Sequence, residues 1–409
     1  MLRGFLRIAI PCLLLIAVLA AAKYMDSAGY ALRNQSSGKP LQTNAVVQET
    51  QPAYTETTEP AETEPAETTV VTEPEETQPA ETELEATVSD ATEPAETVSD
   101  EVEQQTFVFT FLGDCTLGAV PTAYYAEVGF VKTIGEDYLY PFENVRQYME
   151  NDDFTFLNLE GPLTDTGNPI ESRYTFRGPE RFVNILTMNS VEGVTIANNH
   201  TLDYGMTGMN NTRRVLDEAQ IPYAEKDCSR VVTLENGLTV GLYATSFASL
   251  DKAAMVSEIS AMREQGVNVI IYAAHWGTEG SYRPSGEQKE LAYAAIDAGA
   301  NIVFGTHPHV LQPIEEYNGG VILYSMANFS FGGHQQLRDM DTAVVQQEVI
   351  LQPDGTVVLG ERNLVPCSIS SREQFNNYQP TPYEVGSEEY NRVLEKLSGT
   401  FTGRDLVME

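Results

Sequence analysis

The sequence of 409 residues has little histidine, tryptophan, cysteine or positive charge. It contains five histidines, one tryptophan and four cysteines, and its 24 Lys and Arg face 59 Asp and Glu. The net charge of −35 argues against nucleic acid as a partner, because neutralising phosphates requires clustered Lys and Arg. Four cysteines are too few for a disulfide-dense scaffold and none are paired at metal-ligand spacing, although a Cys228–Cys367 disulfide remains open.

Long apolar runs are also missing, except for one near the N-terminus. Arg3 and Arg7 precede an apolar run from Ile8 to Ala22. A run of about 15 apolar residues behind positive charges is typical of a secretory signal or a short anchor, whereas a full span usually needs roughly 17–25. We therefore expect residues 1–30 to be a signal peptide or a membrane anchor. The rest of the chain is then expected at the extracellular side of the cell membrane, or secreted if the leader is cleaved.

Lys and Arg are absent between residues 40 and 105, where a Thr-Glu-Pro-Ala-Glu-Thr unit recurs. Such a segment is too hydrophilic and too self-repelling to bury a core, and its prolines interrupt helices. We expect residues 31–105 to form a disordered acidic linker. It could carry a domain away from a membrane, or it could be a solvated spacer without a partner.

From Thr106 onward, short apolar stretches alternate with helical patterns. Strands are expected at 107–112, 154–159, 194–197, 240–244, 269–274, 301–305 and 321–325, and helices at 141–151, 179–189, 208–219, 252–265 and 286–298. Glu235-Asn236-Gly237 and Pro353-Asp354-Gly355 are hairpin signals. Together these features indicate a mixed α/β sandwich over residues 106–370. The extension at 371–409 is polar and is expected to be helical or loose.

Four of the five histidines lie in short blocks of ligand-type residues. The five blocks are Gly113-Asp114, Asn158-Leu159-Glu160-Gly161, Asn198-Asn199-His200-Thr201-Leu202-Asp203, His275-Trp276-Gly277-Thr278-Glu279 and Gly305-Thr306-His307-Pro308-His309. Each follows an expected buried strand, so all five could meet at one edge of a sheet. Imidazole, amide oxygen and carboxylate form the ligand set of a hydrolytic metal centre. The pattern therefore predicts such a centre.

Three of the blocks have a plain structural explanation when taken alone. Asp114 could accept hydrogen bonds in a turn, Glu160 could be a surface carboxylate, and His275 could be a core residue with its hydrogen bonds satisfied. The fifth histidine, His334, has no matching context and is expected in a loop.

The other two blocks carry sharper expectations. Asn199 could bind a metal while His200 acts as a general acid oriented by Asp203, or the block could be a capped helix N-terminus. His307 and His309 alternate around a proline that favours extended backbone, so both imidazoles are expected to face one site.

These blocks resemble the bacterial capsule synthesis proteins of the CapA type, the membrane-anchored, outward-facing components of poly-γ-glutamate synthesis and export. The resemblance covers roughly residues 106–370 and lies in Phe-Leu-Gly-Asp-Cys-Thr-Leu-Gly, Asn-Leu-Glu-Gly-Pro-Leu-Thr, Asn-Asn-His-Thr-Leu-Asp-Tyr-Gly, His-Trp-Gly-Thr-Glu, Gly-Thr-His-Pro-His-Val-Leu-Gln-Pro and Ser-Met-Ala-Asn-Phe-Ser-Phe.

That family is in turn similar to the calcineurin-like metallophosphoesterases, whose four-layer α/β/β/α sandwich holds two metals. The resemblance implies that the metal ligands are Asp114, Glu160, Asn199, His275, His307 and His309. It further implies that Glu160 bridges the metals and that His200 protonates the leaving oxygen. Thr116 stands where those enzymes have a histidine, so one metal position lacks an imidazole. We expect one or two divalent transition-metal ions, of Mn, Fe or Zn.

Two functional hypotheses follow. The first is an exported metal-dependent hydrolase that acts on an anionic envelope polymer or its phosphorylated precursor. Arg173 and Arg177 are candidate substrate contacts, because guanidinium matches carboxylate and phosphate oxygens, or they are solvated surface arginines. The second is a non-catalytic polymer-binding subunit of an envelope export complex, working with membrane synthase subunits.

Overall fold

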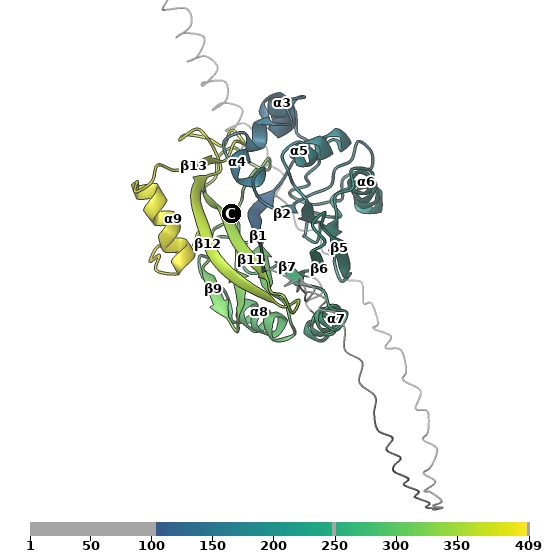
Figure 1. The fold of residues 1–409 in the computed structure, drawn as a ribbon. Coiled ribbons are helices and arrows are strands. Elements are labelled where there is room, and N and C mark those ends of the chain that lie inside the picture. Colours follow the sequence, from purple (N-terminus) through teal and green to yellow (C-terminus); the bar gives the residue numbers. More distant parts are fainter. Residues whose placement is uncertain (1–103, 248–250, 407–409) are drawn as a thin grey trace, which may run out of the picture. The chain divides into compact units, whose positions relative to one another are not determined.

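The computed structural model describes residues 104–247 and 251–406, which fold around two β-sheets (Figure 1). The expected leader at 1–30 and nearly all of the expected linker at 31–105 lie outside the described residues. Within the described part, no helix is long and apolar enough to cross a membrane. Cys115, Cys228 and Cys367 are free thiols, so the Cys228–Cys367 disulfide is not formed.

The first sheet has seven strands in the order β13-β12-β11-β1-β2-β3-β4. They are β1 (Gln105–Cys115), β2 (Phe154–Leu159), β3 (Gly193–Thr195), β4 (Tyr223–Ala224), β11 (Asp341–Leu351), β12 (Val357–Ser368) and β13 (Thr381–Pro382). Strands β1 to β4 run parallel, whereas β11 pairs with β1 antiparallel. The carboxyl ends of β1, β2 and β3 therefore lie at one edge.

The second sheet has six strands in the order β5-β6-β7-β8-β10-β9. They are β5 (Arg230–Thr233), β6 (Thr239–Ser246), β7 (Val269–His275), β8 (Ile302–Thr306), β9 (Ile314–Tyr317) and β10 (Gly320–Leu323). Strands β6, β7, β8 and β10 are parallel. The expected hairpins are confirmed, since β5 pairs antiparallel with β6 and β11 with β12.

The sheets face each other across an apolar core, and helices cover their outer faces. Phe111 and Phe156 of the first sheet contact Phe304 of the second, with ring centroids 5.8 and 5.3 Å apart. The outer face of the first sheet packs against α3 (Phe130–Ile134), η1 (Tyr140–Phe142), α4 (Arg146–Met149), η2 (Glu180–Phe182), α5 (Val183–Thr187) and α6 (Gly205–Glu218). The second packs against α7 (Lys252–Glu264) and α8 (Gly286–Asp297). The α/β/β/α sandwich is thus confirmed.

Some expected elements are shorter or broken. The single helix expected at 141–151 is wrong, because residues 143–145 separate η1 from α4. The last of them, Val145, has a φ of −120°, which is not helical, and its side chain is fully buried. The Asn144 amide also donates to Thr381 Oγ1 at 2.8 Å, which holds the break against β13. A further short helix, α2 (Ala123–Val128), was not anticipated.

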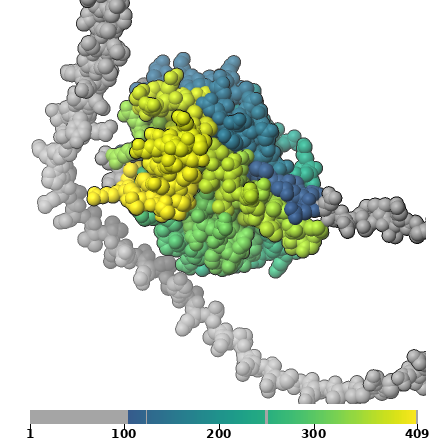
Figure 2. Space-filling model, turned by 60° about the vertical axis from the view of Figure 1, so that its left-hand side comes forward, coloured from purple at the N-terminus to yellow at the C-terminus, as the bar shows by residue number. Residues whose placement is uncertain are grey.

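The C-terminal segment packs tightly on the sandwich. Its helix α9 (Glu388–Ser398) inserts Val393 and Leu397 into the core between the sheets. Lys396 is only 3% exposed and forms ion pairs of 2.6 Å with Asp339 and 2.7 Å with Asp341. Figure 2 shows the yellow C-terminal residues forming one continuous surface with the green and blue parts of the domain.

Candidate metal centre

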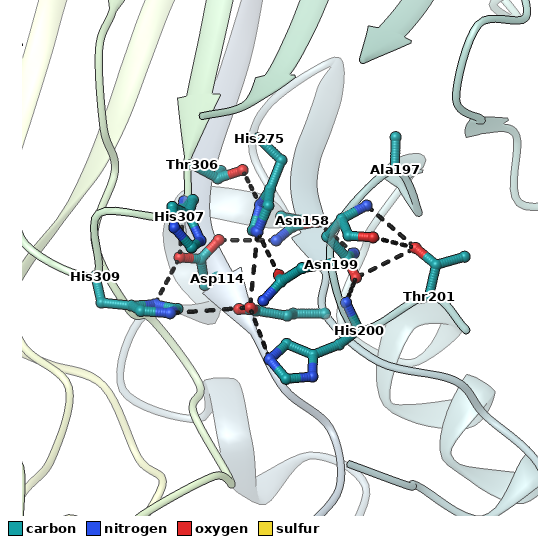
Figure 3. Close-up of polar contacts among 12 residues, drawn as sticks. Asp114, Asn158, Ala197, Asn199, His200, Thr201, His275, Thr306, His307 and His309 are labelled. Atoms are coloured by element: carbon teal, nitrogen blue, oxygen red, sulfur yellow. Dashed lines mark hydrogen bonds and ion pairs between the residues drawn. The ribbon is translucent and has the colours of Figure 1, made fainter. Parts of the chain in front are cut away.

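The five ligand-type blocks converge where strands of both sheets end. Asp114 lies at the end of β1, just past a register shift in its pairing with β2, and Glu160 directly follows β2. His275 is the last residue of β7, and His307 follows β8. Figure 3 shows the labelled histidine side chains and Asp114 gathered around a common point.

Glu160 lies at the middle of this cluster as a buried carboxylate without a partner. It is 1% exposed, and neither of its oxygens has a hydrogen bond. Its Oε1 lies 4.0 Å from the Nε2 atom of His200 and 3.9 Å from those of His275 and His309. Burial and the neighbouring Asp114 raise the pKa of Glu160 to about 7. A buried carboxylate is costly unless it is paired, so this position favours a cation.

His309 and Asp114 face each other beside Glu160. His309 Nδ1 lies 3.1 Å from Asp114 Oδ2, but the contact lacks the angle of a hydrogen bond. Burial alone would lower the pKa of His309, yet the carboxylates of Glu160 and Asp114 raise it to about 9. One ligand atom from each of the three residues lies within 4.8 Å of the others. A positive charge is therefore favoured here, and a divalent metal ion would supply it.

A second group of donors lies on the opposite sheet. His275 Nδ1 contacts Thr306 Oγ1 at 2.9 Å, which leaves Nε2 facing Asn199 Oδ1 at 2.7 Å. His307 Nδ1 is buried and has no partner. Burial and the nearby histidines lower the pKa of His307 to about 2 and that of His275 well below its usual value. Both imidazoles are therefore neutral, which is the form that binds metals.

His200 occupies the rim of the cluster and is held from two sides. Its Nδ1 lies 2.8 Å from Asp203 Oδ2, which also accepts the backbone N–H of Phe176 at 2.6 Å. The Phe176 ring packs against the imidazole with centroids 4.4 Å apart. Burial lowers the pKa of His200, but the hydrogen bond to Asp203 raises it above the usual value. Nε2 therefore points toward Glu160 and can carry a proton.

The capped-helix explanation for the Asn199–His200 block is wrong. Helix α6 begins at Gly205, and the preceding Tyr204 provides no side-chain cap. Asn198 instead accepts the backbone N–H of His200 at 3.1 Å and donates to Asn158 Oδ1 at 3.0 Å. Asn158 in turn donates to Asp114 Oδ1 at 2.8 Å. This amide chain, absent from the sequence prediction, links the block to Asp114.

The backbone around Pro308 differs from the expectation. His307 and His309 have φ of +95° and +57°, so they are left-handed rather than extended. Hydrogen bonds to residues distant in the sequence stabilise this conformation. Gly280 N donates to Pro308 O at 2.8 Å, and His307 N donates to Asp114 Oδ2 at 3.4 Å. Both imidazoles still reach the cluster. Strained backbone of this kind is concentrated at functional sites.

Three residues at the centre were not assigned a role from the sequence. Glu279 ends the ligand-type block after β7 but was not counted among the ligands, and its carboxylate falls in one group with His307 and His309, with ligand atoms within 4.8 Å. Phe247 and Phe331 flank these histidines, with ring centroids 4.1 Å from His307 and 5.6 Å from His309. These two apolar rings limit the access of water to the histidines. No spacing pattern in the sequence could have identified Phe247 and Phe331 as neighbours of the site.

The remaining predicted residues lie outside the ligand cluster. Arg177 stacks over Tyr204 and Arg173 over Tyr174, each at 5.0 Å from the ring centroid. Among the residues that the structure describes, neither guanidinium forms an ion pair with a carboxylate. His334 accepts the backbone N–H of Gln336 at 2.9 Å in a loop, as expected.

The fold and the cluster define a class: two-sheet α/β/β/α proteins with a candidate metal centre at the strand ends. Residues 108–333 match the model of a family described as bacterial capsule synthesis protein PGA_cap. The chain therefore belongs to the bacterial capsule synthesis protein family, as its motifs indicate.

Two relatives extend the comparison beyond that segment. The chain is 30% identical to the capsule biosynthesis protein CapA of Bacillus anthracis over 72% of this chain and 74% of the relative. It is 29% identical to the PGA biosynthesis protein CapA of Bacillus subtilis strain 168, over 75% and 80%. Among solved structures, the match with Haemophilus influenzae NAD nucleotidase spans 73% of this chain and 63% of the nucleotidase chain. The two are 12% identical, with a TM-score of 0.36.

Proposed function

We propose that the protein acts at the outer side of the cell membrane in capsule or poly-γ-glutamate biosynthesis and export, as a metal-dependent hydrolase. An N-terminal membrane segment would hold it there beside membrane synthase subunits, and its substrate would be an anionic envelope polymer or a precursor. The proposal rests on one observation above all. Glu160 is a fully buried carboxylate with two unpartnered oxygens, ringed by three imidazole nitrogens at 3.9–4.0 Å.

The donors present fit one or two divalent transition-metal ions, such as Mn²⁺, Fe²⁺ or Zn²⁺. Those that would hold them are Asp114, Glu160, Asn199, His275, His307 and His309. When bound, such ions polarise an ester or amide and lower the pKa of water. Orphaned buried atoms on Glu160, His307 and His309 support this fit, because each would be satisfied by a metal.

His200 and Asp203 supply the proton chemistry in this proposal. Asp203 holds Nδ1 at 2.8 Å and thereby leaves Nε2 free to face the centre. The raised pKa of His200 keeps a proton available for the leaving oxygen. Arg177, stacked on Tyr204 and without a carboxylate partner among the described residues, is the proposed contact for the negative charge of the substrate, and Arg173 is a second candidate.

A non-catalytic role in polymer binding is the alternative, and one observation favours it. Thr116 stands where an imidazole would complete the donors around Asp114 and His309. Its hydroxyl is fully buried and has no hydrogen-bond partner. In this alternative the cluster would hold a cation that bridges the acidic protein to an anionic polymer, without turnover.

The two proposals are separated by turnover in the purified full-length protein. With Mn²⁺ present, we expect hydrolysis of bis(p-nitrophenyl) phosphate or of γ-glutamyl p-nitroanilide by the wild type. We expect loss of that activity in His307→Ala and retention in His334→Ala, which removes a histidine outside the cluster. Absence of turnover, together with normal polymer in cells carrying His307→Ala and His309→Ala, would favour the non-catalytic subunit.

A further inference from the structure

Glu279 is an exposed carboxylate placed directly beside the buried histidines. Its ligand atom lies within 4.8 Å of one nitrogen on His307 and one on His309. Donors that bind one metal at 2.0–2.2 Å lie up to about 4.4 Å apart, so a small side-chain movement would let all three share an ion. The negative charge of Glu279 is close enough to raise the pKa values of both Glu160 and His309.

An independent observation on His307 points to a ligand at the same place. This side chain is 7% exposed, and its Nδ1 atom has no hydrogen-bond partner. A buried acceptor without a donor is costly, and a metal ion next to it would remove that cost.

The backbone that carries Glu279 is fixed to the histidine loop. The N–H of the next residue, Gly280, donates to Pro308 O at 2.8 Å, between the two histidines. The C-terminal segment also forms two hydrogen bonds with this loop. Leu406 N donates to Gly280 O at 2.9 Å, and Asp405 Oδ1 accepts the N–H of Tyr282 at 3.1 Å. The backbone next to Glu279 is therefore held beside the two histidines, although the Glu279 side chain is exposed.

We infer that Glu279 is a further metal-ligating carboxylate, which makes up for the imidazole that Thr116 does not supply. The inference rests on the proposed metal centre. It also specifies the type of ion. With Glu279, the donors around His309 are three carboxylates, since Asp114 and Glu160 form the other group with that ring, and two imidazoles, His307 and His309 itself. Oxygen-rich sets suit Mn²⁺, whereas imidazole-rich sets suit Zn²⁺.

The test is a Mn²⁺ titration of the full-length protein, followed by electron paramagnetic resonance and calorimetry. We expect Glu279→Gln to weaken Mn²⁺ binding by at least roughly 10–100-fold, the range seen for groups that support metal ligands. Glu287→Gln, an equal charge change at an exposed position on α8, is expected to bind as the wild type does. Glu279→His is expected to restore binding but to favour Zn²⁺ over Mn²⁺.

The outcomes distinguish this inference from the proposal beneath it. If Glu279→Gln binds Mn²⁺ with the stoichiometry and affinity of the wild type, the inference is overturned and the metal centre stands. If the wild type binds neither Mn²⁺ nor Zn²⁺, the metal centre is overturned as well.

Discussion

Replacing His200 by alanine is expected to lower kcat by roughly 10²–10⁴-fold while the metal content stays unchanged. The reason is that His200 Nδ1 is bound to Asp203 at 2.8 Å, and its Nε2 is available for the leaving oxygen. It is not among the groups of residues with ligand atoms within 4.8 Å of one another. The measurement is steady-state turnover of whichever test ester or amide the wild type hydrolyses, with metal analysis of the same samples.

Asp203→Asn provides the matched variant for this prediction. An amide at 203 no longer raises the pKa of His200, so the fall in kcat should be smaller than in His200→Ala. Because a proton donor loses activity as the pH rises through its pKa, the high-pH limb of the pH profile should shift to lower pH. If His200→Ala lost its metal along with its activity, or kept full turnover, the assignment of His200 as the proton donor would be wrong.

Replacing Lys396 by methionine is expected to destabilise the domain by about 3–5 kcal/mol, the cost of leaving buried charges without their partner. Its ammonium group is buried against the carboxylates of Asp339 and Asp341, at 2.6 and 2.7 Å. Arg392 would still reach Asp341 at 2.7 Å, but Asp339 would lose its cation. The measurement is the free energy of unfolding from urea titration at pH 7.

Lys252→Met is the control, because the Lys252–Glu290 ion pair of 2.9 Å lies on the surface and should contribute nothing measurable. The network also predicts acid sensitivity. Despite burial, Arg392 and Lys396 hold the pKa of Asp341 below its usual value of 3.8. That contribution is present above this pH and is lost as the pH falls through the folded pKa. If Lys396→Met had the same free energy of unfolding as the wild type, the claim that this ion-pair network holds α9 on the sandwich would be wrong.

Most of the sandwich is predictable because its central strands are buried on both faces. An apolar run marks β7 and a largely apolar run marks β2 almost residue for residue, and the helical period marks α7 and α8. The C-terminal helix α9 was beyond prediction as a packed element. Two of its residues, Lys396 and Arg392, pair with Asp339 and Asp341, which lie more than 50 residues away in the sequence. A sequence does not show which basic residue will find such a partner.

The candidate centre is predictable to a similar degree. The rule that parallel strands end at one edge brings Asp114 and Glu160 together. His275 ends a strand of the second sheet, so the expectation of a single sheet edge is wrong, and the site forms because the two sheets face each other. Local sequence misleads at Pro308, where proline favours extended neighbours but contacts with Gly280 and Asp114 impose left-handed backbone. Glu279 belongs to one of the predicted blocks but was not assigned as a ligand, because its approach to His307 and His309 depends on the path of a loop.

The central claim is that the cluster around Glu160 binds metal, and metal content tests it most directly. The measurement is elemental analysis of the full-length wild type beside His309→Ala and the control His334→Ala. We predict one or two transition-metal ions per chain in the wild type and in His334→Ala, and a clear loss in His309→Ala. A wild type that holds no metal after incubation with Mn²⁺, Fe²⁺ or Zn²⁺, or a His309→Ala variant that retains it all, would contradict the account.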